Sequence, residues 1–415
     1  MAKSSGDRHR SARLLIRVED GAFASRLLAR ETSPGVRTRV LGVLRWQHLL
    51  DHVLEPFLKR PISRLDPEVR TVLRMGCFEI HHLGVPAPVA TDSMIRLTRR
   101  LRKASAAGMV NAVLRRAAAG VGSLPEPDLK WSHPEWLWLR WSEFFGADSA
   151  ENAMAAAQEP APPWVWFVDD RQASVSEEGG VVLEPHPWCP ETWTAVEGRS
   201  QLMARIDGGA VIVQDPSSQM VARLAVGAAG GSGRAADLCA APGGKTALLN
   251  KLGLWDHLVA ADISPVKAWR LDHRLDDVSV VVGDAGRPAL CTGGWDLALL
   301  DAPCSGTGTF RRHPELKWRL TPESIDEAAE HQRLMIGAAL DLLAPGGVLV
   351  YATCSVEPEE NEAHFLDVRE GFERARLEDH LPAGLPWSET TAGGVRILPH
   401  EHGDGFTVHA LRRRA

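Results

Sequence analysis

Two cysteines, Cys304 and Cys354, each follow a short apolar run that is typical of a buried strand. The first run, LALL, ends at Asp301, and Pro303 must terminate this strand because proline fixes its own φ and lacks a backbone N–H. The second run, GVLVYA, ends in Thr353 and then Cys354. Thiolates act as nucleophiles in covalent catalysis, and carboxyl groups transfer protons. These strand ends therefore carry the groups that a covalent reaction needs, at the sheet edge where open α/β proteins bind ligands.

A third strand ends in a glycine-rich turn. The sequence RAADLCA leads into Ala240-Ala241-Pro242-Gly243-Gly244-Lys245, and a helix is predicted to follow. Such a turn lets a ligand approach the backbone closely, and a helix N-terminus favours a carboxylate or a phosphate. The first glycine of the phosphate-binding loop is missing, which argues against a nucleoside triphosphate as the ligand.

Two further strands end in acids. HLVAADI presents Asp262, 25 residues after Asp237, close to the spacing at which an acid binds a ribose in Rossmann-like sheets. VSVVVGDA presents Asp284. A single acid in this position is more often a helix cap. Three successive strands that end in an acid or a glycine turn favour a binding edge instead.

The pattern of apolar residues divides the chain. Residues 206–415 alternate between strand-like and helix-like segments, which predicts a parallel sheet with helices on both faces. Residues 8–120 show only helical spacing. Residues 131–205 combine a tryptophan-rich helix with short strands. These tryptophans could stack on bases, although a place in the core is the more common role.

Length and composition exclude several classes of protein. A chain of 415 residues exceeds one ordinary core, so two or three domains are expected. No apolar run is long enough to cross a bilayer, and the basic start lacks the apolar core of a signal peptide, so we expect a cytoplasmic protein without a membrane partner. The six cysteines form no C-x-x-C pair, so we expect no metal and no disulfide framework.

The two halves of the chain differ in charge. Residues 1–120 hold 22 Lys and Arg against 10 Asp and Glu, a net charge of +12, so the rest of the chain carries −18 of the total of −6. A basic part joined to an acidic one suggests that a polyanion is bound mainly by the first. An arginine-rich solvated helical surface explains the charge equally well.

The helical block resembles the NusB-like RNA-binding fold. The resemblance is carried by GVLR (42–45), VRTVLRMG (69–76) and MVNAVLR (109–115). What it implies is docking to RNA or to protein, and no chemistry.

The second half resembles the RNA 5-methylcytosine methyltransferases of the RsmB/NOP/Sun family. The motifs that carry the resemblance are, in chain order, QDPSSQMVARL, DLCAAPGGKT, DAPCSGTGTFRRHPELKW, YATCSVEPEENE and DGF. With the helical block, the chain is most similar to the bacterial members that act on small-subunit (16S) ribosomal RNA. The resemblance implies an all-α NusB-like domain (1–122), a small α+β subdomain (123–205) and an α/β Rossmann-like methyltransferase domain (206–415).

The resemblance also implies roles for individual residues. Cys354 matches the nucleophile, Cys304 matches the cysteine that releases product, and Asp301 matches the acid at the reaction centre. The implied cofactor is S-adenosylmethionine, the implied partner is RNA and not DNA, and we expect a monomer. The implied cofactor-binding residues are Cys239, Ala240, Ala241, Pro242, Gly243, Gly244, Lys245, Asp262, Asp284 and Asp301.

The chemistry of cytosine explains why such residues are needed. Carbon 5 is a poor nucleophile, but a thiolate added to carbon 6 turns the ring into an enamine that can attack a methyl group. A protonated Asp301 could donate to nitrogen 3, and Lys245 or Lys317 could offset charge on the carbonyl oxygen. A second thiol could act as the base that completes the reaction. The target base must be flipped out or single-stranded.

Several alternatives remain open from the sequence. DNA cytosine methyltransferases use their Pro-Cys thiol as the nucleophile, which would exchange the roles of Cys304 and Cys354. The substrate could be transfer RNA, or the chain could be a non-catalytic RNA-binding or transcription factor on a decayed enzyme, although none of the catalytic motifs is lost. A small-molecule methyltransferase would leave the basic front without a role.

Two segments bear on RNA contacts. Residues 164–169 read WVWFVD where the family has Arg-x-Asn, and residues 404–407 read DGFT where it has Asp-Gly-Phe-Phe. Arg311, Arg312 and His313 could bind the RNA backbone, and a solvated basic turn is the alternative.

Overall fold

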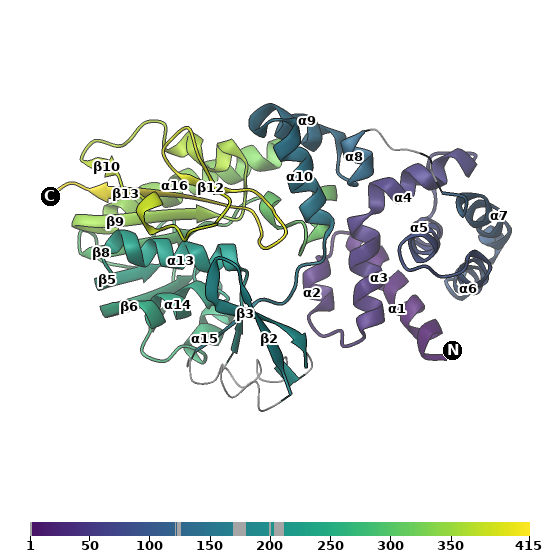
Figure 1. Ribbon diagram of the computed structural model, residues 1–415, viewed down its shortest axis with the longest axis horizontal. Helices are drawn as coiled ribbons and strands as arrows, with labels where there is room; N and C mark the ends of the chain where they lie inside the picture. Colours follow the sequence, from purple (N-terminus) through teal and green to yellow (C-terminus); the bar gives the residue numbers. More distant parts are fainter. Residues whose placement is uncertain (1, 121, 123–125, 169–179, 199–200, 203–210) are drawn as a thin grey trace. The chain divides into compact units, whose positions relative to one another are not determined.

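The structure, a computed structural model, describes residues 2–120, 122, 126–168, 180–198, 201–202 and 211–415 (Figure 1). It contains two compact units. Unit 1 comprises Met1–Pro160 and Phe310–Arg319, and unit 2 comprises Ala161–Thr309 and Leu320–Ala415. A short segment from the second half of the chain, residues 310–319, is therefore part of the helical unit.

Unit 1 is helical in its described residues, as the spacing of apolar residues predicts. Its α-helices are α1 (Ala2–Glu19), α2 (Ala24–Leu28), α3 (Pro34–Arg45), α4 (Gln47–Leu54), α5 (Pro67–His81), α6 (Ala87–Arg100), α7 (Ala107–Ala117), α8 (Pro127–Lys130), α9 (Glu135–Phe145) and α10 (Ala147–Gln158).

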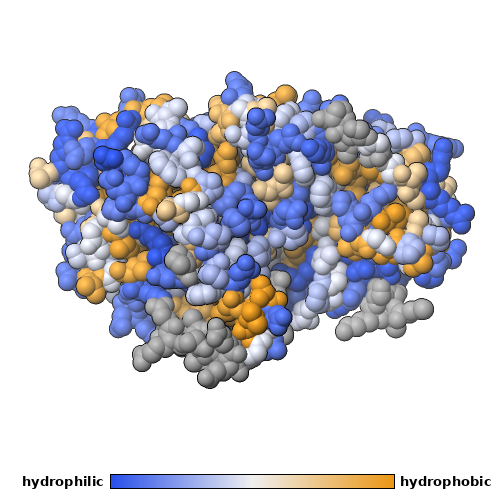
Figure 2. All heavy atoms as spheres, in the orientation of Figure 1, coloured by the Kyte–Doolittle hydropathy of each residue, from blue (hydrophilic) through white to orange (hydrophobic). Residues whose placement is uncertain are grey.

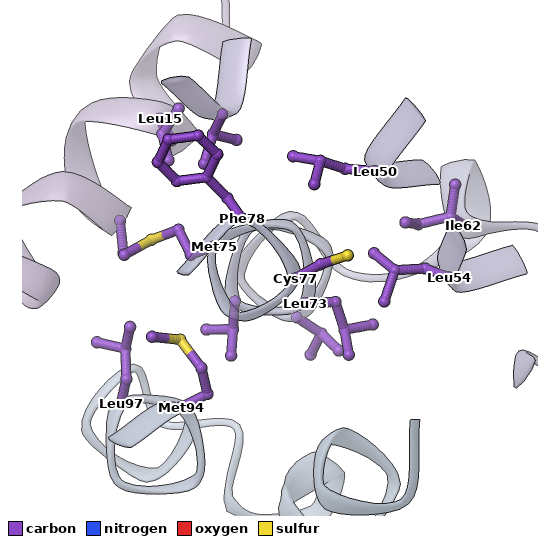
Figure 3. Close-up of a cluster of buried hydrophobic side chains, with 14 of the residues drawn as sticks. Leu15, Leu50, Leu54, Ile62, Leu73, Met75, Cys77, Phe78, Met94 and Leu97 are labelled. Carbon is purple, nitrogen blue, oxygen red and sulfur yellow. The ribbon is translucent and has the colours of Figure 1, made fainter. Parts of the chain in front are cut away.

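Helix α5 is the centre of the unit 1 core (Figure 3). Its buried side chains face neighbouring helices on all sides, among them Met75 and Phe78. The glycines of the two resemblance motifs permit this packing. A Cβ on Gly42 of α3 would lie 2.0 Å from the Phe78 ring, and a Cβ on Gly76 would lie 2.6 Å from Leu114. Only glycine allows the helices to approach this closely.

The N-terminus of α5 differs in one respect from the expected cap. Asp66 occupies the N-cap position and Pro67 the first helical position, but the Asp66 carboxylate makes no capping hydrogen bond. It accepts a hydrogen bond from Lys103 Nζ at 2.8 Å instead. A carboxylate is stabilised more by a charged donor than by a neutral backbone N–H, which explains the exchange of partners.

Part of the positive charge of unit 1 is used internally. Glu79 is fully buried in α5 and accepts hydrogen bonds from Arg8 and Arg39 at 2.8 and 2.6 Å. Arg99 and Arg100, at the C-terminus of α6, are exposed. The outward-facing charge that could meet a polyanion is therefore smaller than the sequence count suggests.

The compact units divide the predicted 123–205 subdomain between them. Helices α8 to α10 belong to unit 1, whereas the strands that follow belong to unit 2. The physical reason lies around Ser132, a buried residue just before α9, whose Oγ accepts hydrogen bonds from the backbone N–H groups of His48 and Leu49 at 3.0 and 3.2 Å. These bonds join α9 to the start of α4.

Unit 2 is built on a large mixed sheet of order β11-β12-β13-β9-β8-β5-β6-β7, with β10 paired to β13. Strands β5 to β9 are mutually parallel, and β13 runs antiparallel to β9. The strands of this sheet are β5 (Ser232–Asp237), β6 (Leu254–Asp262), β7 (Ser279–Val282), β8 (Trp295–Asp301), β9 (Leu343–Thr353), β10 (Phe372–Arg374), β11 (Ser388–Glu389), β12 (Val395–Ile397) and β13 (Phe406–Arg413). The Rossmann-like fold expected from the alternating pattern is confirmed, with an antiparallel edge added.

Helices cover both faces of this sheet. Alternate residues of β8 enter different cores: Leu297 and Leu299 pack with α13 and α14, whereas Ala298 and Leu300 pack with α16. This alternation is the two-residue period of a strand that is buried on both sides. The helices are α13 (Pro216–Ala229), α14 (Gly244–Leu252), α15 (Pro265–Asp272) and α16 (Pro322–Leu342).

A smaller antiparallel sheet of order β2-β3-β1-β4 precedes the large one in the chain. Its strands are β1 (Val165–Phe167), β2 (Val182–His186), β3 (Cys189–Glu197) and β4 (Val211–Val213). The departure from the family pattern at residues 164–169 includes β1 and the residues on either side of it, and Asp169 lies outside the described residues. Trp164 and Trp166 are buried.

The surface of the described residues mixes polar and apolar side chains. On the face drawn in Figure 2, hydrophobic residues lie in small patches among hydrophilic ones. No helix in the described part of the chain has the length and apolarity needed to cross a membrane.

Candidate active site

The strand order creates a crevice at the edge where the candidate residues were predicted. Strand β5 is flanked by β6 on one side and by β8 on the other, so the connections leave β5 and β8 in opposite directions along the sheet. Such a switch point is where open α/β sheets bind ligands. The glycine turn follows β5, and the Pro-Cys motif follows β8. Both motifs therefore lie at the switch point.

The turn after β5 is tightly constrained. Gly243 has φ +103°, and a Cβ at this position would lie 2.7 Å from Leu271 Cδ2. The backbone N–H of Gly243 donates to the carbonyl of Ala240 at 2.8 Å, which closes the turn just before α14 begins. Both the conformation and the close approach require glycine.

Asp237, at the end of β5, is buried beneath this turn. Its Oδ2 accepts a hydrogen bond from Thr246 Oγ1 at 2.7 Å, and its Oδ1 is buried without a hydrogen-bond partner. Burial raises the pKa of Asp237 to about 7. A buried acceptor without a partner in a native fold calls for an explanation, and a ligand or an ordered water is the usual one.

The two outer acids lie at the ends of β6 and β7. Asp262 is 5 % exposed, and its Oδ1 accepts a hydrogen bond from the backbone N–H of Ser264 at 2.9 Å. Asp284 is exposed, and its Oδ1 accepts from the N–H of Gly286 at 2.8 Å. Each acid thus stabilises its own turn through Oδ1. Its second carboxylate oxygen can bind a ligand, so the capping role and a binding role are compatible.

The acid of the Pro-Cys motif pairs with the lysine of the glycine turn. Lys245 Nζ lies 2.6 Å from Asp301 Oδ2, and this pair joins α14 to the end of β8. Burial lowers the pKa of Lys245, but the Asp301 carboxylate more than offsets this effect and the net pKa is raised. The pairing therefore favours the charged form of Lys245. Phe406 of the DGF motif lies beside the pair, with its ring centroid 5.2 Å from Lys245 Nζ.

The two candidate cysteines are in contact. Strands β8 and β9 are parallel neighbours, with Asp301 opposite Ala352, and Cys304 Sγ lies 3.4 Å from Cys354 Sγ. The hydrogen bond with Cys354, together with burial, raises the pKa of the Cys304 thiol well above its usual value. Two thiols this close do not both ionise, so at most one of the pair is a thiolate at any time.

A buried polar network holds the two cysteine loops together. Glu360 is fully buried, and its carboxylate accepts hydrogen bonds from the N–H of Ser305 at 2.8 Å and from Gln332 Nε2 at 3.0 Å. Gln332 also donates to the carbonyl of Pro303 at 2.9 Å. The N–H of Gly308 donates to the carbonyl of Cys354 at 3.0 Å. The separation of the thiols is therefore fixed by the bonds between the loops.

Glu360 lies in the motif YATCSVEPEENE without an assigned role, and Gln332 lies outside the quoted motifs. A short 3-10 turn, Pro358–Glu360, follows Cys354. Asn361 donates from Nδ2 to the carbonyls of Ser355 and Glu357 at 3.2 and 2.8 Å, so the chain folds back on itself. A glutamate and an asparagine five and six residues after Ser355 are a weak signal for such a turn.

Other candidate residues belong to unit 1. Lys317 is fully buried in unit 1, where its Nζ donates to two backbone carbonyls, so it cannot offset charge on a bound base. That prediction is wrong for Lys317 and leaves Lys245 as the candidate. Arg311 is also buried, at 2 % exposed, so it does not form part of a solvated basic turn on the RNA path.

Comparison with known proteins agrees with this arrangement. The profile of the family described as 16S rRNA methyltransferase RsmB/F matches residues 231–412, and that of the NusB family matches residues 4–119. The chain is 32 % identical over 384 residues to the ribosomal RNA small subunit methyltransferase B of Yersinia pestis, covering 88 % of this chain and 87 % of that protein. The chain belongs to the 16S rRNA methyltransferase RsmB/F family. The protein of the same name from Pasteurella multocida is 29 % identical, covering 97 % of this chain and 95 % of that one.

Solved structures share the fold of this RsmB/F family member. The crystal structure of PH0851 matches with a TM-score of 0.77 at 23 % identity, covering 98 % of each chain. The structure of NSun6 from Pyrococcus horikoshii with SFG matches with a TM-score of 0.56 at 20 % identity, covering 68 % of this chain and 98 % of that one.

The RsmB/F family uses S-adenosylmethionine as its cofactor, and the residues at the switch point fit it. The turn after β5 has no side chain at Gly243 that would obstruct a ligand, and the buried Asp237 Oδ1 leaves an acceptor unused. The acids at the ends of the next two strands suit hydroxyl groups and an amine. This set resembles the donors and acceptors that a nucleoside linked to an amino acid requires.

Gly243→Ala is expected to weaken S-adenosylmethionine binding by at least about tenfold, because both the positive φ and the contact with Leu271 oppose a Cβ. Isothermal titration of the cofactor measures this. Gly384→Ala is the matched control, since Gly384 has φ +84° but open space around its Cβ position. Equal affinities of the two variants would show that the turn does not bind the cofactor.

Proposed function

We propose that this protein methylates carbon 5 of a cytidine in 16S ribosomal RNA through a covalent bond between Cys354 and the base. The observation that carries the proposal is the 3.4 Å contact between two thiols at neighbouring strand ends, beside the Lys245–Asp301 ion pair. One thiol is needed to activate the ring and a second group is needed to complete the reaction, and this edge supplies both.

The assignment of Cys354 as the nucleophile is supported by the proton balance of the pair. The hydrogen bond with Cys354, and then burial, raise the pKa of Cys304, so Cys304 keeps its proton in the free enzyme. In the proposed reaction Cys354 attacks as the thiolate, with Cys304 donating an S–H hydrogen bond to it. Once Cys354 is bonded to carbon 6, Cys304 releases its own proton to solvent and can then act as a base.

In the proposed reaction, named residues donate and accept the protons that are transferred. As the Cys354 sulfur bonds to carbon 6, the ring electrons move to nitrogen 3, which takes a proton from the Lys245–Asp301 pair. S-adenosylmethionine, when bound, would supply the methyl group: carbon 5 would bond to it as the bond between the methyl group and the sulfonium sulfur breaks, and that electron pair would stay on the sulfur. Cys304 then removes the proton from carbon 5, the electrons form the bond between carbons 5 and 6, and Cys354 leaves as a thiolate. Nitrogen 3 returns its proton to the pair.

The choice of RNA is supported by the relatives. The proteins of P. multocida and Y. pestis are both described as ribosomal RNA small subunit methyltransferase B. The NusB-like unit is consistent with an RNA substrate, which would place the reaction in the cytoplasm. Transfer RNA is the alternative substrate from the same chemistry.

The proposal is tested with a methyl-labelled cofactor and two purified RNAs, small-subunit ribosomal RNA and total transfer RNA. After digestion, mass spectrometry identifies the labelled nucleoside. We expect 5-methylcytidine from ribosomal RNA alone. A label confined to transfer RNA, a different methylated nucleoside, or no methyl transfer to either RNA would each contradict the proposal.

A further inference from the structure

Residues 310–319, FRRHPELKWR, fold as part of unit 1 although they directly follow the loop that carries Cys304. We name residues 310–319 the docked segment and residues 302–309 the Pro-Cys loop. The docked segment is largely sequestered from solvent. The residues that are at most 2 % exposed are Phe310, Arg311, Glu315 and Lys317.

The docked segment caps the C-terminus of helix α3. Lys317 Nζ donates to the carbonyl of Arg45, the last residue of α3, and Trp318 Nε1 donates to the carbonyl of Leu44, at 2.8 and 2.6 Å. The final carbonyls of a helix have no partner within the helix, and they attract positively charged donors. Lys317 also donates to the carbonyl of Ser132 at 2.8 Å, which joins α3 to the region before α9.

A second helix end is capped by the same segment. Arg319 donates to the carbonyl of Val18, in the last turn of α1, at 3.0 Å and also to the carbonyl of Ala22. Its guanidinium lies 4.4 Å from the centroid of the Phe23 ring. In return, Arg45 donates to the carbonyl of Arg311 at 2.7 Å. Two basic residues of the segment, Lys317 and Arg319, thus cap helix ends.

The position of Lys317 is narrowly defined. Burial, and then the nearby Arg45 guanidinium, lower the pKa of Lys317 well below its usual value. A buried amine is destabilising unless its hydrogen bonds are made. The two carbonyls therefore allow Lys317 little freedom, and the docked segment has one well-defined register on unit 1.

The connections from the docked segment to the catalytic unit are short. Gly308 is bonded within unit 2, where its N–H donates to Cys354 at 3.0 Å and its carbonyl accepts from Gly405 at 2.8 Å, and only Thr309 separates it from Phe310. At the other end, one residue separates Arg319 from Thr321, which caps α16. Because a residue spans at most about 3.6 Å, the single residue between Phe310 and Gly308 leaves little slack in this connection.

Taking Cys304 as the thiol that completes the proposed reaction, we infer that Lys317 is a positioning residue: by fixing the docked segment on unit 1, it holds the Pro-Cys loop in the conformation that keeps Cys304 against Cys354. The helical unit then has a role in catalysis besides any role in RNA binding. A change at Lys317 alters the rate of the chemical step and leaves the binding of cofactor and RNA unchanged.

The test uses the full chain with Lys317→Met, which fills the same space but makes neither hydrogen bond. Amide hydrogen exchange is followed by mass spectrometry in peptides covering residues 302–309. We expect exchange there to rise at least about tenfold, as for the loss of two hydrogen bonds of ordinary strength. The single-turnover rate at saturating RNA is expected to fall about tenfold, while KM for RNA and Kd for S-adenosylmethionine change by less than about twofold.

Two further variants keep the result interpretable. Val72→Ala removes volume from the fully buried centre of unit 1 without touching the docked segment, so it lowers Tm but leaves exchange in the Pro-Cys loop and the single-turnover rate unchanged. Trp318→Phe keeps an aromatic ring but loses the hydrogen bond to the carbonyl of Leu44, and we expect amide exchange in the Pro-Cys loop to rise about threefold. This variant provides the test if Lys317→Met does not fold.

The two readouts separate this inference from the proposed function. Increased loop exchange in Lys317→Met and Trp318→Phe supports the positioning role, whichever nucleoside the wild type modifies. Loop exchange and turnover that match those of Val72→Ala would overturn it, because Lys317 would then only stabilise unit 1. An equal loss of RNA affinity and rate would also overturn it, since a binding role would account for the whole effect.

Discussion

Replacing Cys354 with alanine is expected to lower the rate of methyl transfer by at least about 10⁴-fold, because the reaction then loses the sulfur that activates the base. Carbon 5 of cytosine cannot attack a methyl group until a nucleophile has been added to carbon 6. Cofactor affinity should be unchanged, because the residues proposed to bind S-adenosylmethionine follow β5, β6 and β7, whereas Cys354 follows β9. Single-turnover incorporation of a labelled methyl group into ribosomal RNA measures the rate.

Cys291→Ala is the matched control for the loss of a thiol. Cys291 is an exposed cysteine in the same unit, located before β8 and away from the strand ends. We expect wild-type turnover from this variant. Full activity of Cys354→Ala combined with an inactive Cys304→Ala would exchange the two roles, as in the DNA cytosine methyltransferases.

Lys245→Met is expected to lower kcat by about 10²- to 10⁴-fold, the usual contribution of a positioned acid or base. The change removes the ammonium that lies 2.6 Å from Asp301 and supplies the proton for nitrogen 3. Asp301→Asn should cause a similar loss, and the double variant should be little worse than either single one, because the two residues act as a unit. Steady-state kinetics with RNA at saturation measures these effects.

Lys251→Met is the control for a lysine in the same helix. Lys251 Nζ donates to the carbonyl of Phe167 at 2.8 Å, so its loss can affect stability but should leave kcat unchanged. Additive losses in the double variant of Lys245 and Asp301 would contradict the shared role. So would a Lys245→Met variant whose only defect is a raised KM for the cofactor.

The helices and strands whose apolar residues recur at a regular spacing could be predicted from the sequence. Alternation of strands and helices in residues 206–415 gave the Rossmann-like sheet, and helical spacing gave unit 1. The proximity of Cys304 and Cys354 also follows from pattern, because both end neighbouring parallel strands. The antiparallel pairing of β13 with β9 could not be predicted this way, since the apolar pattern of a strand carries no signal for its direction.

The contacts that depend on tertiary packing could not be predicted. No role for Glu360 or Gln332 could be read from the sequence, because their role arises only where the chain folds back beside the Pro-Cys loop. Lys317 was predicted, as an alternative to Lys245, to offset charge on the carbonyl oxygen of the base. Its burial depends on a hydrogen bond to the carbonyl of Arg45, which lies 272 residues away in the sequence. No local sequence pattern indicates such a contact.

The most direct test of the central claim is a search for a denaturant-stable bond between protein and RNA. Wild type, Cys354→Ala and Cys304→Ala are incubated with S-adenosylmethionine and small-subunit ribosomal RNA, and the products are separated on a denaturing gel. The account predicts that Cys304→Ala accumulates a protein–RNA adduct and that Cys354→Ala forms none. An adduct in Cys354→Ala but not in Cys304→Ala would contradict the assignment of the nucleophile, and methyl transfer with no adduct in any variant would contradict covalent catalysis itself.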